Sequence, residues 1–118
     1  MSYRVDRINE EIKKELSRLI RDEVNDYRIK DRMVSIVKVD CSNDFKFAKV
    51  YISVIEGKEV RDEVTNALNN AKGFLRRELG KVLKTYNTPQ ITFISDDTLE
   101  YGIKINKLLK ELDKKNDK

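Results

Sequence analysis

The residues best suited to chemistry in this sequence are basic side chains gathered between positions 72 and 84. Five lysines and arginines stand there against a single acid, so the excess charge of this segment equals the +4 of the whole chain. They are Lys72, Arg76, Arg77, Lys81 and Lys84. Basic side chains concentrated in one segment, with acidic segments on both sides, indicate a polyanionic partner that is met in one orientation.

The spacing of apolar residues predicts how these bases are held. A stripe at intervals of three and four runs through Leu75, Leu79, Val82, Leu83 and Tyr86. This spacing predicts a helix with one buried face, which Thr88-Pro89 ends. The face opposite the stripe then carries Gly73, Arg77, Lys81 and Lys84.

A second helical stripe ends just before the basic segment, and the two stripes do not share a phase. Its residues are Val60, Val64, Ala67, Leu68 and Ala71. Because Phe74 lies off the stripe that follows, we predict two helices that meet at a kink in Ala71-Lys72-Gly73, where glycine takes backbone angles that are costly for other residues. Lys72 then stands where the later helix begins, so a phosphate there would meet both its ammonium group and unpaired backbone N–H groups.

The two glycines of this segment leave alternatives open. Gly73 fits an internal role, by permitting the kink or close helix packing, and an external one, by letting an RNA backbone approach. Glycine inside a helix costs roughly 1 kcal/mol relative to alanine, so Gly80 marks the close approach of a group that the sequence does not identify.

An N-terminal helix is predicted from Val5 to Val24 by a further apolar stripe, Val5, Ile8, Ile12, Leu16, Leu19 and Ile20. The side opposite this stripe carries a basic ridge of Arg7, Lys14, Arg18 and Arg21. Six acids and six bases lie between Arg4 and Val24. An RNA contact and a solvated face crossed by ion pairs between successive turns are therefore equally consistent with this ridge.

The remaining segments predict a small sheet. Residues 34–39 and 48–55 are β-branched and apolar, and the polar residues 41–44 between them predict an antiparallel hairpin. Residues 90–95 predict a third strand, and a last helix follows, with Asp97 capping it and Glu100 reaching back. The last helix carries Leu99, Ile103, Ile105, Leu108, Leu109 and Leu112. This order predicts an α+β fold with helices on one face of a three-stranded sheet, for which we expect the strand order 2-1-3.

Length and composition narrow the function. A chain of 118 residues predicts one domain, which we place at 1–113, followed by a disordered basic tail at 114–118. With one cysteine, Cys41, and no histidine, it has no intrachain disulfide and lacks the commonest general bases and zinc ligands. It has no apolar stretch long enough for a membrane span and no signal peptide. We therefore expect a cytoplasmic monomer without cofactor, metal, membrane contact or small-molecule substrate.

The element order is that of KH-like domains, and the residues resemble one family, ribosome-binding factor A, whose members are bacterial factors of small-subunit maturation. The specific part is Ala71-Lys72-Gly73-Phe74-Leu75-Arg76 with Leu79-Gly80-Lys81. Further matching stretches over nearly the whole chain are Arg4-Val5, Asp26, Arg28, Val37-Lys38-Val39, Asp44-Phe45, Ala48-Lys49-Val50-Tyr51-Ile52-Ser53, Pro89, Phe93 and Asp96. Tyr27, Tyr86 and Gln90 depart from the family, which usually has proline, arginine and glutamate there.

The resemblance implies a type II KH-like fold in which the Ala-x-Gly kink replaces Gly-x-x-Gly. It further implies binding to the free small (30S) ribosomal subunit and its rRNA, a role in late maturation and 5′ processing of 16S rRNA, importance in cold adaptation, and no catalysis.

Three other functions compete with this interpretation. Asp96, Asp97 and Glu100 are carboxylates of the kind that hold magnesium in a nuclease, although the predicted helix cap explains two of them. The basic segment and the lysine-rich tail also suit a protein-interaction module with an acidic partner. A general KH-type binder of single-stranded RNA is disfavoured by the missing Gly-x-x-Gly and by the lack of an aromatic stacking platform beside the basic stripe.

Overall fold

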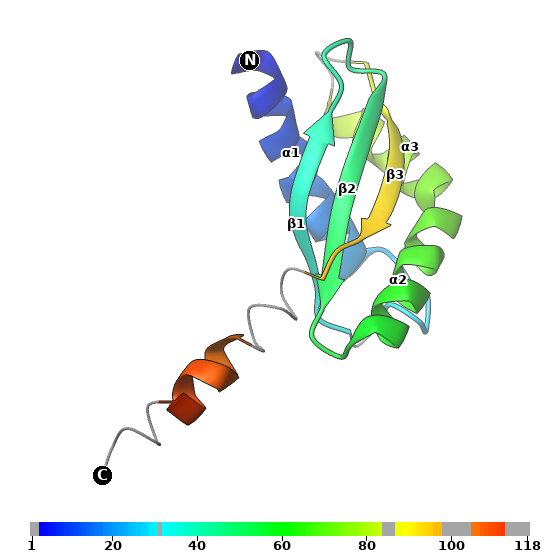
Figure 1. Cartoon of the computed structure of the whole chain (residues 1–118). Helices are drawn as coiled ribbons and strands as arrows, with labels where there is room; N and C mark the ends of the chain where they lie inside the picture. The colour runs from blue at the N-terminus through cyan, green and yellow to red at the C-terminus, as the bar shows by residue number, and fades with distance from the viewer. Residues whose placement is uncertain (1–2, 31, 84–86, 98–104, 113–118) are drawn as a thin grey trace.

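The structure, a computed structural model of the chain, describes residues 3–30, 32–83, 87–97 and 105–112 (Figure 1). Its elements are α1 (Tyr3–Asp22), β1 (Val34–Cys41), β2 (Phe47–Val54), α2 (Lys58–Asn70), α3 (Lys72–Val82) and β3 (Gln90–Ser95). The strands lie in front of α1 and α3 in Figure 1, and the α+β class predicted from the sequence is confirmed.

The three strands form one sheet in the order β1-β2-β3. β1 and β2 pair antiparallel, as predicted for a hairpin, and β3 returns through α2 and α3 to pair parallel with β2. The expected order 2-1-3 is therefore wrong. Alternating apolar residues occur in both hairpin strands, so the pattern alone does not say which one is central. Two features fit an edge position for β1 and a central one for β2: a register shift after Ile36, and the burial of Ile52, Ser53 and Val54 in succession.

The core lies between the sheet and the helices. All six apolar residues predicted for the first stripe are buried in α1, which confirms that prediction. α2 contributes Val64, Ala67 and Leu68, and α3 contributes Leu75 and Leu79. At the end of α3 the prediction is wrong in part, because Val82 is 50% exposed while Leu83 is buried. The chain leaves the helix at Leu83, whose ψ is 65°, and this turns its side chain rather than that of Val82 into the core.

The break between α2 and α3 lies at Ala71, with φ −93° and ψ 3°. Its N–H donates to the carbonyl oxygens of Ala67 and Leu68, so the helical hydrogen bonding of α2 extends as far as Ala71. Gly73 is already inside α3, and among the described residues only Gly57 is a glycine with positive φ. The kink is present as predicted, but it does not use the conformational freedom of Gly73.

Residues 105–112 are helical and lie away from the sheet (Figure 1). The predicted apolar stripe appears there as exposed side chains: Ile105, Leu108, Leu109 and Leu112. The predicted cap partner Glu100, the apolar residues Leu99 and Ile103, and the tail 114–118 lie outside the described residues.

Candidate nucleic-acid interface

The start of α3 is exposed, and no side chain neutralises its positive end. Ala71 precedes the helix without a side-chain cap, and the first turn contains no acidic residue. Lys72, Gly73 and Phe74 are all exposed. A helix start carries a partial positive charge, so this surface attracts an anion both through the backbone and through the ammonium group of Lys72.

Gly73 has no partner inside the protein that requires a glycine. A Cβ atom built on it meets nothing within 4 Å, and its φ is not positive. Glycine in a helix nevertheless costs about 0.5–1 kcal/mol relative to alanine. Of the two roles that the sequence left open, the internal one therefore finds no support at this position, and a bare stretch of backbone remains on the surface beside Lys72.

The basic residues predicted for α3 differ in whether they form ion pairs within the chain. Lys72 and Arg77 are exposed and form no ion pair with the described residues. Lys81 pairs with Glu78, with Nζ 2.7 Å from Oε2, although its side chain stays 68% exposed. Lys84 lies outside the described residues. Lys72 and Arg77 are thus the cations most available to a phosphate.

Arg76 is exposed but is already engaged within the chain. Its Nη2 donates to the carbonyl oxygen of Thr88 at 2.9 Å, and its Nε donates to that of Pro89 at 3.2 Å. The guanidinium group therefore ties α3 to the segment that leads into β3. A helical projection of the sequence does not reveal this contact, because the partner is twelve residues away along the chain.

Gly80 has an internal reason to be glycine. A Cβ atom at this position would lie 2.8 Å from the Thr88 Oγ1 atom, which is closer than Cβ atoms come to other non-bonded atoms. The group whose close approach the sequence could not identify is thus Thr88. Arg76 and Gly80 together hold the segment before β3 against α3.

The basic ridge of α1 is exposed, and most of it is paired. Arg7 faces Glu11 at 3.6 Å, Arg18 pairs with Glu15, and Arg21 pairs with Asp22. The hydrogen bonding that Arg18 donates to the Glu15 carboxylate is the main reason why the pKa of Arg18 is raised. Only Lys14 of the four has no ion pair with the described residues. Exposed ion pairs contribute little to stability, so these arginines remain accessible but are partly neutralised.

The carboxylates considered for a magnesium site do not gather in the described part of the chain. Asp96 is half-buried and Asp97 exposed after the end of β3, while Glu100 is not among the described residues. Within the ranges that the structure describes, no group of three or more His, Cys, Asp and Glu side chains is placed to hold a metal ion. No helix within those ranges is both long and apolar enough to cross a membrane.

Sequence reasoning overlooked a second group of free cations. Lys38, Lys46 and Lys49 are exposed on the hairpin, and none forms an ion pair with the described residues. The alternation of apolar and polar residues in β2 already placed Lys49 on the side away from the core. That pattern could have indicated that this face of the sheet is partly solvated. They lie on a different surface from the start of α3.

The fold and the start of α3 define a class of protein: a small α+β domain that presents an uncapped, basic helix start on its surface. The chain belongs to the ribosome-binding factor A family, because the sequence profile of that family matches residues 4–109. The ribosome-binding factor A of Caldanaerobacter subterraneus subsp. tengcongensis is 44% identical over 114 residues, which are 97% of this chain and 93% of that protein. That of Clostridium novyi is 44% identical over 113 residues, 96% of this chain and 93% of that protein.

Solved structures agree with this assignment. The solution structure of a Thermotoga maritima protein assigned to ribosome-binding factor A is 35% identical and superposes with a TM-score of 0.66, covering 83% of this chain and 92% of that one. A homology model of the Thermus thermophilus factor, fitted into a cryo-electron microscopy map of its complex with 30S, gives a TM-score of 0.57 at 16% identity. It covers 82% of this chain and 96% of that one, and at this identity it shows the fold alone.

Proposed function

We propose that this chain binds the free small (30S) ribosomal subunit and assists the late maturation of its 16S rRNA, including 5′ processing, with importance during cold adaptation. It acts as a cytoplasmic, monomeric, type II KH-like domain, without catalysis and without a cofactor. Membership of the ribosome-binding factor A family supports this proposal, and so does the similar fold of the Thermus thermophilus factor that is placed on 30S.

The observation that carries the RNA contact is the position of Gly73. It lies in the first turn of α3 beside exposed Lys72, with open space where a side chain would stand. A sugar-phosphate backbone can therefore approach the helix start more closely than a side chain at this position would allow. Arg77, one turn further along the same face, supplies a further phosphate contact.

The other predicted bases take lesser parts. Lys81 reaches phosphate after releasing Glu78, and Lys84 extends the same face of positive charge. Arg7, Lys14, Arg18 and Arg21 form a second strip on the helical side of the molecule. Arg76 acts mainly by positioning α3 through the carbonyl groups of Thr88 and Pro89.

Binding to phosphates recognises the shape of a folded RNA more than its sequence. The domain holds a rearranging segment of rRNA in one arrangement and leaves when the mature subunit no longer offers it. To shift that equilibrium, it must bind the immature arrangement more tightly than the mature one, because equal affinity for two states shifts nothing.

Sedimentation of the tagged protein in a sucrose gradient of cell lysate tests this function. We expect the protein with free small subunits and not with whole ribosomes. The variant Lys72→Glu/Arg77→Glu should move to the top of the gradient, whereas the charge-matched control Lys30→Glu/Lys58→Glu, which changes exposed lysines elsewhere, should sediment like the wild type. Equal association of both variants with small subunits would contradict the proposed site, and absence of the wild type from that fraction would contradict the function.

A further inference from the structure

The sheet has one face that α1, α2 and α3 leave open. Alternation along the strands places Ala48, Val50 and Ile52 of β2 toward the helices, so the residues between them point the other way. By the strand register, this outer face consists of Ser35, Lys38, Asp40, Phe47, Lys49, Tyr51, Ser53, Gln90, Thr92 and Ile94. Ser53 is buried and Ile94 half-buried, so the open part is the half of the face next to the hairpin turn.

Two aromatic rings stand on this open half. Phe47 is 59% exposed and Tyr51 is half-buried, and both belong to β2. They are four positions apart on one face of the strand, which corresponds to about 13 Å. Lys49 lies between them on the same face. The Lys38 Nζ atom lies 6.0 Å from the centre of the Tyr51 ring.

The charge around these rings is positive and unpaired. None of Lys38, Lys46 and Lys49 forms an ion pair with the described residues. Three of the four basic residues on the ridge of α1, in contrast, do form ion pairs. Asp40, opposite Lys49 in the register, is the one carboxylate among the ten residues of the outer face. The open half therefore suits a partner that is anionic and has flat apolar surfaces.

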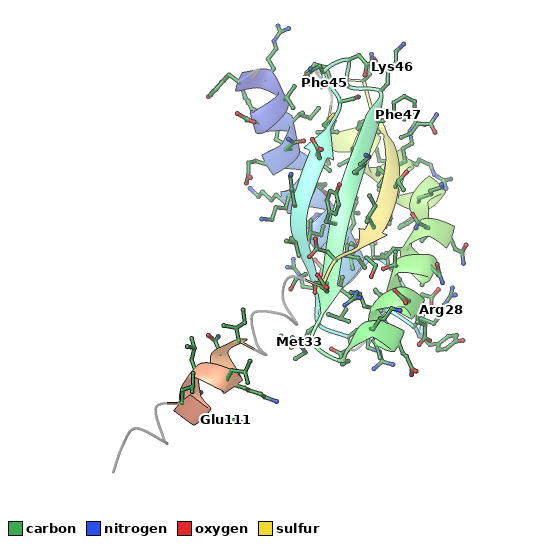
Figure 2. All side chains as sticks on the ribbon, in the orientation of Figure 1. Arg28, Met33, Phe45, Lys46, Phe47 and Glu111 are labelled. Atoms are coloured by element: carbon green, nitrogen blue, oxygen red, sulfur yellow. The ribbon has the colours of Figure 1, made fainter. Side chains whose placement is uncertain are left out.

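The hairpin turn holds Lys46 and Phe47 in place. An Asp44 carboxylate oxygen accepts hydrogen bonds from the Ser42 hydroxyl at 2.6 Å and from the Lys46 N–H at 3.1 Å. The Phe47 N–H donates to the Ser42 Oγ atom at 3.1 Å. Figure 2 shows Lys46 and Phe47 together at the end of the sheet opposite to Met33 and Arg28. These bonds fix the backbone that carries Phe47, so only side-chain torsions are ordered when a base stacks on its ring.

We infer that the open half of the sheet face is a second RNA-binding site, which takes unpaired nucleotides by stacking bases on Phe47 and Tyr51 while Lys38, Lys46 and Lys49 contact the phosphates. Proteins hold single strands without strong sequence preference by placing aromatic side chains between lysines and arginines. A duplex hides its base faces, so this site distinguishes unpaired from paired RNA. It is separate from the start of α3, and the two sites allow the protein to hold a folded element and an adjoining single strand together.

Fluorescence anisotropy of a labelled, unpaired RNA octamer of mixed sequence, titrated with the full-length protein, tests this site. Phe47→Ala and Tyr51→Ala should each weaken binding by at least about fivefold, and at most about 150-fold, because one stacked base is lost. Tyr51→Phe keeps the ring and should bind as the wild type does. Tyr27→Ala is the matched control, since Tyr27 is 84% exposed in the loop after α1 and should not matter. If the circular dichroism spectrum shows that an alanine variant is unfolded, Phe47→Leu or Tyr51→Leu replaces it in the titration.

The outcomes separate this site from the proposed helical one. Lys72→Glu/Arg77→Glu should lower the octamer affinity no more than the charge-matched control Lys30→Glu/Lys58→Glu does, even if it abolishes binding to small subunits. The inference is overturned if the wild type does not bind the octamer, if removal of both rings leaves octamer binding intact, or if Tyr27→Ala weakens it as much. Loss of subunit binding in the ring variants without loss of octamer binding would also overturn it, because the face would then contact protein.

Discussion

The side-chain amide of Asn69 forms two hydrogen bonds with the backbone of Phe93. Its Nδ2 donates to the Phe93 carbonyl oxygen at 3.0 Å, and the Phe93 N–H donates to its Oδ1 at 2.8 Å. β3 is an edge strand, so these backbone groups would otherwise face water or another chain. Asn69 lies two residues before the break at Ala71, and it therefore fixes the place on the sheet from which α3 starts.

Replacement of Asn69 should destabilise the protein measurably. Asn69→Ala removes two hydrogen bonds with a net value of roughly 0.5–1.5 kcal/mol each, so we expect the free energy of unfolding to fall by about 1–3 kcal/mol. Urea denaturation followed by circular dichroism measures it. Asn70→Ala, which changes the exposed neighbour, should be nearly neutral. Equal effects of the two substitutions would show that the contact with β3 contributes nothing.

Gly73→Ala should separate stability from function. The added methyl group meets no atom of the protein, and alanine favours the helix, so the free energy of unfolding should stay the same or rise by up to about 1 kcal/mol. Affinity for the small subunit should fall, because the methyl group stands where the RNA backbone approaches. A variant that binds small subunits as well as the wild type would mean that the bare backbone is not used.

Gly80→Ala should have the opposite profile. Its methyl group would clash with the Thr88 hydroxyl, and overpacking of this kind typically costs about 1–3 kcal/mol of stability. Thr88→Ala in the same chain removes the clashing oxygen and should restore part of the loss. The four unfolding free energies of this double-mutant cycle measure the coupling. Strict additivity of the two substitutions would contradict the close contact.

The salt bridge of the loop after α1 should contribute to acid sensitivity. The Arg28 guanidinium group, which donates to both carboxylate oxygens of Asp26, lowers the pKa of that carboxyl group, and the Arg28 N–H lowers it further. Since the folded pKa is below the unfolded value of about 3.9, the contribution is fully present above that value and is lost as the pH falls through the folded pKa. Unfolding free energies of the wild type between about pH 6 and about pH 2 should therefore fall more steeply than those of Asp26→Asn. Parallel curves would contradict this assignment.

Local patterns in the sequence predicted the elements but not their neighbours. The stripe of α1 and the bounds of β3 agree with the structure, because each follows from periodicity within one segment. The predicted strand order does not agree with the structure. The packing of α2 and α3 decides which strand of the hairpin pairs with β3, and local periodicity does not report that packing. The same limit applies to the contact of Asn69 with Phe93 and to that of Gly80 with Thr88, which join residues far apart in the chain.

The candidate site was predictable in outline. Charge and spacing singled out Lys72, Gly73 and Arg77, and all three are exposed in the structure. Helical spacing did not distinguish these from Arg76, whose guanidinium group turns toward the segment before β3. The sequence left an internal and an external role open for Gly73 and named no neighbour for Gly80, whose contact with Thr88 only the structure reveals.

The salt dependence of binding to purified small ribosomal subunits tests the phosphate contacts at the start of α3 most directly. Each phosphate contact contributes a slope of about −0.9 in a plot of log affinity against log salt concentration on duplex RNA or DNA. For Lys72→Gln/Arg77→Gln, which removes two contacts without adding negative charge, we predict a slope shallower than that of the wild type by roughly 1.8. Identical slopes for the variant and the wild type would contradict the account.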